Sequence, residues 1–194
     1  MPRKYELKQR ALSQAETRQR ILEATVALHS SLGPARTTIS AIAERAGVQR
    51  LTVYRHFADE RSLFQGCRDL WMAENPAPDV SPWAALEDPA ERMRVALCEI
   101  YAYFRSTEEM TGNLVRDFAV SSAVREAAVP FMQYWESVQQ VLERGWTARG
   151  RRRTRLRAVI GHAVAFETWR SLARSQGLED AEAAELMVRL ARAV

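Results

Sequence analysis

The chain has 194 residues, of which 47% are hydrophobic and 27% are charged, with only 8 glycines and 7 prolines. This length suits one sizeable domain or a small domain joined to a larger one, and the composition is that of a folded, mostly helical protein. No apolar run approaches the ~18 residues that span a bilayer, and the N-terminal MPRKYELKQR lacks the apolar segment of a secretory signal. Two cysteines, Cys67 and Cys98, form neither a disulfide framework nor a metal-ligand pattern. We therefore expect a cytoplasmic protein with no metal and no cofactor.

Positive charge is concentrated at the N-terminal end of the chain. Residues 1–65 hold 11 of the 28 Lys and Arg residues and 6 of the 24 acids, a net charge of +5, whereas the remainder is nearly neutral. A basic end on a neutral body is typical of a protein whose N-terminal part faces a polyanion.

The first third of the chain predicts three short helices followed by a longer one. Ser13 and Glu16 form a capping box that opens the first helix, which a Gly-Pro pair ends. Thr38 is a good N-cap for the second helix, and Gly47 ends it after about two turns. Asp59 caps a helix that runs to about residue 73.

The rest of the chain predicts a helical bundle. Residues 75–89 hold four of the seven prolines and indicate a loop or linker. Pro130 is expected either to kink or to divide the helical segment that contains it. No repeat and no convincing strand is found. Helices are predicted over residues 88–106, 107–118, 121–146, 153–175 and 180–193.

The stretch AGVQRLTVYRHF, residues 46–57, poses a local conflict. Its β-branched and aromatic residues favour a strand, but a lone strand needs neighbours and the chain offers none. As a helix from Gln49 to His56 it turns Val53 and Phe57 inward and leaves Arg50 projecting outward. Two short helices joined by a Gly-containing turn form a helix-turn-helix, whose second helix enters the major groove of DNA.

Residues from about Ala15 to Leu63 resemble the DNA-binding domain of the TetR (tetracycline repressor) family. The matching residues are Thr37-Thr38, Ile42-Ala43, Ala46-Gly47-Val48, Thr52-Val53-Tyr54, His56-Phe57 and Leu63. The resemblance implies an all-α fold with an N-terminal three-helix DNA-binding domain and a C-terminal helical bundle for effector binding and dimerisation. We expect a basic arm over residues 1–12, the DNA-binding domain over 13–64 and the effector-binding body over 65–194.

The resemblance further implies a homodimeric bacterial repressor, associated with the nucleoid when it is bound to DNA. It would bind a palindromic operator in double-stranded DNA and be released by a small molecule that enters the helical body. Few charged residues fall at buried-looking positions of the body, which favours an apolar effector. The sequence does not identify that effector, the operator, the regulated genes or the sign of regulation.

Other functions remain open. A DNA-organising protein without sequence preference would carry the same basic end. An enzyme in the helical body is less expected, because no G-x-S-x-G, H-E-x-x-H or Gly-rich phosphate loop is present. A redox sensor at either cysteine is a further alternative, although thiols on apolar helix faces are inert.

The resemblance also assigns contacts with DNA. Residues expected to read base edges are Ser40, Gln49 and Arg50, and residues expected to hold phosphates are Thr38, Thr52, Tyr54, His56 and Arg61. Arginine can bond guanine, and glutamine adenine, through two hydrogen bonds in the major groove. Hydroxyl and imidazole groups suit phosphate oxygens, which fix register rather than sequence.

One position departs from the family pattern. Glu60 stands where the family usually has a lysine that meets a phosphate. Arg61 could take over this contact, but one residue along a helix is a rotation of ~100°. The sequence leaves this point open.

Two sets of residues in the body are candidates for function. Apolar side chains that could surround an effector are Met93, Leu97, Tyr101, Phe104, Phe118, Phe131, Trp135, Phe166 and Trp169. Residues on apolar stripes of the last two helices that could form a dimer interface are Leu156, Val159, Ile160, Ala163, Leu186, Met187 and Leu190.

Two basic segments have open roles. The arm with Arg3, Lys4, Lys8 and Arg10 could reach a minor groove. The run from Arg151 to Arg157 is the densest charge in the chain, and a solvated face is favoured over a second DNA patch.

Overall fold

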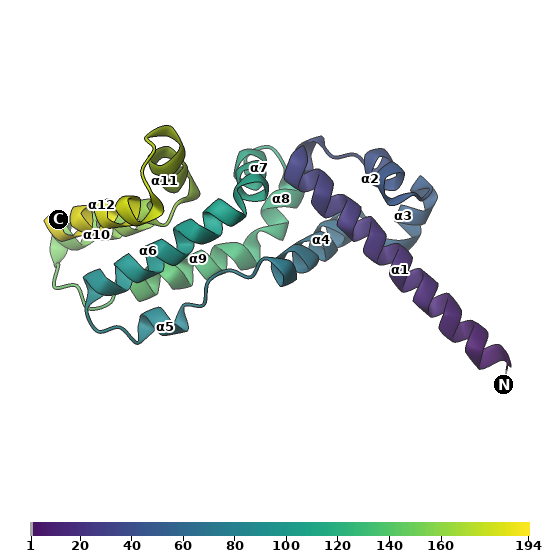
Figure 1. The fold of residues 1–194 in the computed structure, drawn as a ribbon, viewed down its shortest axis with the longest axis horizontal. Coiled ribbons are helices and arrows are strands. Elements are labelled where there is room, and N and C mark those ends of the chain that lie inside the picture. Colours follow the sequence, from purple (N-terminus) through teal and green to yellow (C-terminus); the bar gives the residue numbers. More distant parts are fainter. Residues whose placement is uncertain (1) are drawn as a thin grey trace. The chain divides into compact units, whose positions relative to one another are not determined.

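The predicted all-α fold is confirmed. The computed structural model describes the backbone of residues 2–194 and the side chains of residues 9–194, and it contains no strand in that part of the chain (Figure 1). The chain divides into two compact units. The first comprises Met1–Pro76 with Glu109–Ala128, and the second comprises Ala77–Glu108 with Val129–Val194. Within the described residues, no helix has the length and apolar character needed to cross a membrane.

The first unit is a small helical domain with its own apolar core. Its elements are α1 (Pro2–Ser31), the 3-10 turn η1 (Pro34–Arg36), α2 (Ile39–Ala46), α3 (Arg50–His56), α4 (Glu60–Glu74), most of α7 (Glu108–Phe118) and α8 (Ser122–Ala127). Helices α2 and α4 both pack against α1. The buried core residues are Ile21, Leu22, Ala24, Ile42, Ala43, Ala46, Val53, Phe57 and Leu63.

Helix α1 begins eleven residues before the predicted start at Ser13, so that prediction is wrong. Ser13 lies inside the helix, where its carbonyl oxygen accepts a bond of 2.8 Å from the hydroxyl of Thr17. Residues 3–32 contain no glycine or proline, and most are good helix formers. The helix can therefore begin well before the capping-box sequence and continue through it. The side chains of Arg3, Lys4 and Lys8, from the predicted basic arm, lie outside the described residues.

Helix α7 closes the C-terminal end of α1. The Asn113 side-chain amide donates to the carbonyl oxygens of His29, at 3.1 Å, and Ser30, at 2.5 Å. Arg116 donates to the Leu32 carbonyl oxygen at 2.9 Å, and an Asp117 carboxylate oxygen accepts from the backbone N–H of Ala35 at 2.9 Å. These bonds satisfy carbonyl groups that a helix end leaves without partners, and they fix α7 against the start of the helix-turn-helix.

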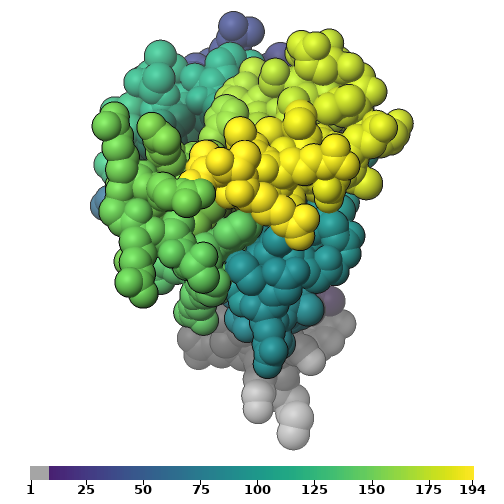
Figure 2. Space-filling model, turned by 90° about the vertical axis from the view of Figure 1, so that its left-hand side faces the viewer, coloured from purple at the N-terminus to yellow at the C-terminus, as the bar shows by residue number. Residues whose placement is uncertain are grey.

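The second unit is a bundle built around α6. Its elements are α5 (Ser81–Ala84), α6 (Pro89–Ser106), α9 (Val129–Leu142), α10 (Gly150–Ala163), α11 (Phe166–Trp169), the π-helical segment η2 (Arg170–Ser175) and α12 (Asp180–Ala193). Helix α12 packs against both α6 and α10, and it lies across the face of this unit shown in Figure 2. Ile100 and Leu142 are fully buried in the bundle core.

Two helical segments of the body differ from simple continuous helices. The segment with Pro130 is divided rather than kinked, because α8 ends at Ala127 and α9 begins at Val129. The predicted continuous helix over 153–175 is wrong: α10 ends at Ala163, and the chain passes through extended backbone at Ala165 before α11. At this break the hydroxyl of Thr168 donates to the His162 carbonyl oxygen at 2.6 Å, so a local hydrogen bond replaces a helical one.

Candidate DNA-binding surface

The turn between α2 and α3 is fixed by its caps. The backbone N–H of Ala41 donates to the Thr38 hydroxyl at 3.2 Å, which confirms Thr38 as the N-cap of α2. Gly47 ends the helix with φ of +65°, in the left-handed region that glycine adopts without strain. The next N–H, from Val48, donates back to the Ala43 carbonyl oxygen at 2.9 Å. These bonds close the three-residue turn, residues 47–49, that connects α2 to α3.

Helix α3 is anchored by two buried side chains. Val53 is 1% exposed and Phe57 is 3% exposed, and both belong to the core formed with α1 and α2. Gln49 is extended and precedes the first helical turn. The stretch AGVQRLTVYRHF is thus a helix and not a strand, because burial of one face outweighs the strand propensity of its residues.

The predicted base-reading residues lie on the outside of this helix pair. Ser40, Gln49 and Arg50 are exposed, as is Thr38 at the start of α2. Tyr54 is about half exposed, whereas Thr52 and His56 are half-buried. The structure thus leaves all seven side chains at least partly accessible on α2 and α3 or directly before them.

Leu51 is a surface residue of α3 that the sequence reasoning did not select. Its side chain is 81% exposed, the highest value among the exposed large hydrophobic residues of the described chain. It stands beside Arg50, at the N-terminal end of the helix where residues reach base edges. An apolar side chain at such a position can contact the C5 methyl group of thymine. Its position before the buried Val53 on a short helix was the signal available in the sequence.

His56 lies in a positive environment. Partial burial, and then the neighbouring Arg55 and Arg18, lower the pKa of His56 below its ordinary value. The imidazole is therefore neutral near pH 7, and its N–H group can donate to a phosphate oxygen. Arg18, from α1, lies over the Phe57 ring with its guanidinium carbon 4.8 Å from the ring centroid. After Leu51, Arg18 is a second exposed residue near α3 that the sequence did not single out.

The region of Glu60 and Arg61 has its own ion pair. Asp59 caps α4 through a reciprocal capping box with Ser62, which leaves Glu60 exposed in the first turn. Arg61 pairs with Glu126 of α8 at 2.8 Å, and both side chains are well exposed. An exposed pair of this kind is weak, so Arg61 keeps the freedom to exchange its carboxylate partner for a phosphate.

The residues predicted to surround an effector are divided between the two units. Phe118 belongs to the first unit, where it is 37% exposed, and the other eight belong to the second. Phe104 packs against Trp135 and Phe166, with ring centroids 5.4 Å apart in each pair. Tyr101 donates its hydroxyl to the Ala163 carbonyl oxygen at 2.8 Å. Six of the eight are buried in the core of the second unit, and Trp135 packs partly buried against it. A cavity of about 490 Å³ in this unit is lined by other residues.

The residues predicted for a dimer interface fall into two groups. Leu156, Ile160, Ala163 and Met187 are buried within the second unit. In contrast, Leu186 and Leu190 are 44% and 42% exposed, one helical turn apart on α12, and Val159 on α10 is half-buried. Only this second group leaves apolar surface available to another chain.

Comparison with known proteins gives the same assignment for the first unit. Residues 21–67 match the family model described as bacterial regulatory proteins, tetR family. The HTH-type transcriptional regulator AcrR of Shigella flexneri is 41% identical over 56 residues, which cover 29% of this chain and 25% of that protein. The match thus spans about a quarter of the length of that relative.

Solved structures extend the likeness to both units. A TetR-like transcriptional regulator from Rhodococcus sp. RHA1 is 21% identical, with a TM-score of 0.63 over 91% of this chain and 93% of that chain. NalD, the secondary repressor of the MexAB-OprM multidrug efflux pump in Pseudomonas aeruginosa, is 19% identical, with a TM-score of 0.59 over 93% and 96%. Residues 21–67 are therefore similar to the DNA-binding region of the tetR family, and the chain has the fold of TetR-like regulators over nearly its whole length.

Proposed function

We propose that this protein is a dimeric, sequence-specific repressor of transcription that binds a palindromic operator and is released from it by a small molecule. The observation that carries the proposal is the outward face of α3. Val53 and Phe57 fix the helix to the core, while Gln49, directly before the helix, and Arg50 and Leu51 in its first turn are exposed. This arrangement presents a hydrogen-bond donor and acceptor, a guanidinium fork and an apolar group to the major groove.

Dimerisation supplies the second half-site. Leu186 and Leu190 give α12 an exposed apolar stripe, and isologous pairing of such a surface produces the two-fold symmetry that a palindromic operator requires. Leu186→Glu should shift the protein from dimer to monomer in sedimentation analysis and weaken operator binding in parallel. A dimer unaffected by this change would place the interface elsewhere.

Selection of bound duplexes from a random DNA pool tests the function. We expect enrichment of a palindrome whose half-site centres lie about 10 bp or a multiple apart. Arg50→Ala should lose discrimination at particular bases, each worth about 1–3 kcal/mol. His56→Ala should weaken binding to all sequences alike, and Arg170→Ala, at an exposed arginine of the second unit, is the control. Equal affinity for selected and random DNA would favour the DNA-organising alternative and refute the proposal.

Leu51 provides a chemical probe of the same assignment. If Leu51 contacts a thymine methyl group, replacing that thymine with uracil in the selected operator should weaken binding about fourfold, the effect of one buried methyl group. Leu51→Ala should bind the two operators equally. A wild-type protein indifferent to uracil at every thymine would exclude this contact without affecting the role of Arg50.

A further inference from the structure

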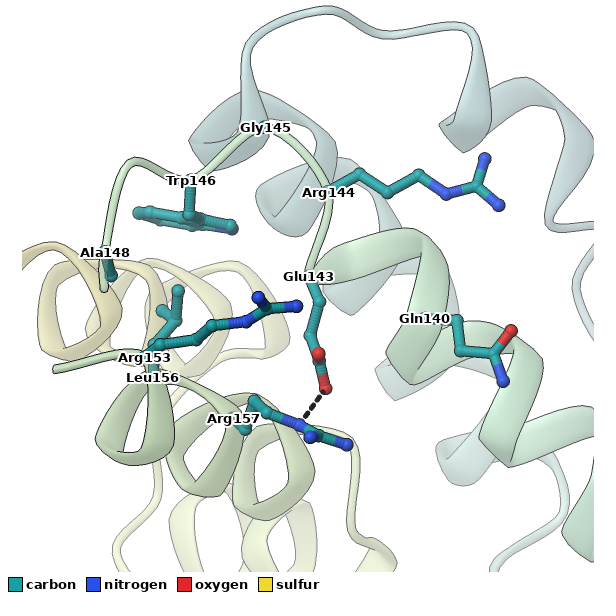
Figure 3. Close-up of a pocket in the computed structure, with 9 residues that line it drawn as sticks. All are labelled: Gln140, Glu143, Arg144, Gly145, Trp146, Ala148, Arg153, Leu156 and Arg157. Carbon is teal, nitrogen blue, oxygen red and sulfur yellow. Dashed lines mark hydrogen bonds and ion pairs between the residues drawn. The ribbon is translucent and has the colours of Figure 1, made fainter. Parts of the chain in front are cut away.

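A cleft of about 490 Å³ opens in the second unit between the end of α9 and the first turns of α10 (Figure 3). This volume is within the range of sites for small molecules. None of the residues predicted to surround an effector contributes to it. The lining residues are Gln140, Glu143, Arg144, Gly145, Trp146, Ala148, Arg153, Leu156 and Arg157.

A buried arginine fixes the chain segment that forms one wall of the cleft. Arg92 of α6 is 5% exposed, and its guanidinium donates to the Arg144 carbonyl oxygen at 2.6 Å and to the Val141 carbonyl oxygen at 3.4 Å. It also donates to the Leu86 carbonyl oxygen through Nε at 3.0 Å. These bonds fix the C-terminal end of α9 and the chain that follows it, so the cleft has a preorganised wall rather than a free loop.

The lining of the cleft carries a net positive charge. Three arginines and one glutamate give a formal charge of +2. Glu143 pairs with Nε of Arg157 at 3.0 Å, whereas no ion pair is recorded for Arg153 or Arg144 among the described side chains. In Figure 3 Arg153 and Arg157 both extend toward Glu143, and Arg144 extends away from them. The guanidinium groups of Arg153 and Arg157 therefore converge, and the single carboxylate of Glu143 neutralises only one of them. The remaining positive charge favours the binding of an anion.

One side of the cleft, beside these charges, is aromatic and apolar. Trp146 is half-buried, and its indole N–H donates to the Leu142 carbonyl oxygen at 2.9 Å, which fixes the ring. Leu156 and Ala148 complete this side. A flat apolar surface beside a guanidinium pair suits a flat ring that carries a negative group.

The cleft and the exposed surface proposed for dimerisation lie on opposite flanks of α10. Arg157 faces Glu143, next to the end of α9, whereas Arg152 donates to the backbone oxygen of Val194 at the end of α12. At ~100° per residue, Arg153 lies on the flank of Arg157, and Val159 lies on the flank of Arg152. Occupation of the cleft is thus compatible with a dimer formed through α12.

We propose that this cleft binds a small aromatic carboxylate, with the carboxylate on Arg153 and Arg157 and the ring against Trp146. The site goes beyond the function proposed above, since it does not depend on DNA binding and differs in place and chemistry from an apolar pocket in the bundle core. It also gives a role to part of the basic run from Arg151 to Arg157, namely the two arginines on the flank that faces Glu143.

Isothermal titration of the full-length protein with indole-3-acetate and with indole-3-acetamide tests the proposal. The two probes share a ring and differ in charge, so the carboxylate should bind at least about tenfold more tightly. Arg153→Gln should weaken the binding of indole-3-acetate by a similar factor. Arg151→Gln removes the same charge from the same helix outside the cleft, so it should change the affinity for indole-3-acetate less than about twofold, because Arg151 does not line the cleft and its charge is screened over the longer distance. Equal binding of the two probes, or equal losses in the two variants, would overturn the proposal.

The aromatic wall is tested by a separate change. Trp146→Phe should weaken indole-3-acetate severalfold and leave the binding of acetate, which has the charge without the ring, unchanged. Arg153→Lys keeps the positive charge but lacks the planar guanidinium group. Its affinity for indole-3-acetate should therefore lie between that of the wild type and that of Arg153→Gln. Thermal melting of each variant checks that the bundle is intact. Absence of saturable binding to the wild-type protein would exclude this class of ligand.

Discussion

Acidification should destabilise the first unit through one buried histidine. His29 is 3% exposed, its ring centroid lies 4.8 Å from that of Phe64, and its Nδ1 lies 3.4 Å from Sγ of Cys67. Nε2 has no hydrogen-bond partner among the residues that the structure describes. Burial lowers the pKa of His29 from 6.5 to about 4, although the carboxylate of Asp117 acts in the opposite direction. His29 is therefore protonated at a lower pH in the folded protein than in the unfolded chain.

The sign and size of the effect follow from linkage. Above pH 6.5 neither state binds the proton, so His29 has no effect on stability. As the pH falls through 6.5 the unfolded chain is protonated first, and stability is lost until the folded pKa of about 4 is reached. The difference between these two pKa values corresponds to roughly 3.4 kcal/mol, because one pKa unit is worth about 1.36 kcal/mol. At pH 5.0 about 2 kcal/mol of this loss is expected.

Urea denaturation at pH 7.5 and pH 5.0 measures the loss, and hydrogen exchange of the α1 amides assigns it to the first unit. His29→Phe is the matched variant, because it keeps a ring beside Phe64 and does not titrate. The variant should lose about 2 kcal/mol less than the wild type between the two pH values. The carboxylates with lowered pKa values, such as Asp117, lose their contribution only at lower pH and are common to both proteins. Equal losses in the two proteins would refute the assignment to His29.

Three further outcomes are expected. Gly47→Ala should cost about 1–2 kcal/mol of stability, because its φ of +65° is strained for alanine, and a thermal melting temperature that does not fall would contradict this. Glu126→Gln should strengthen operator binding by at most about fivefold at low salt if Arg61 contacts a phosphate, and an unchanged affinity in a salt titration would remove Arg61 from the interface. Arg92→Met should destabilise the second unit by about 2–4 kcal/mol in urea denaturation, because several carbonyl oxygens lose a charged donor, whereas a neutral outcome would show that water replaces it.

Helix boundaries were predictable wherever a cap depends on neighbouring residues in the chain. Thr38, Asp59 and Asp88 each accept a backbone N–H at the start of the helix predicted for them. Gly47 adopts the left-handed conformation expected of a C-terminal glycine. These groups are satisfied by atoms within four residues along the chain, so the sequence contains the whole interaction.

Features that depend on distant residues were not predictable in the same way. The break after Ala163 carries no glycine or proline, and α1 passes through a capping-box sequence without stopping. Among the candidates for the dimer interface, the apolar pattern identified the buried face of α10 but not what covers it. Ile160 is covered within its own unit, whereas Leu186 is not. Periodicity shows that a face is apolar and cannot distinguish burial within one chain from burial between two.

The arginines show the same limit for charge. Arg50, Arg92 and Arg153 are equivalent in composition, and each carries a permanent positive charge. Arg92 is buried against backbone carbonyl oxygens and acts as a structural clamp. Arg50 stands exposed on a helix whose other face is fixed, so its charge is available to a large anion. Arg153 lines a recess beside a fixed indole, where we propose that it meets a small anion. The role of each charge is therefore set by the shape and burial around it, and that is why the candidate DNA-binding helix could be inferred from sequence while the cleft required the structure.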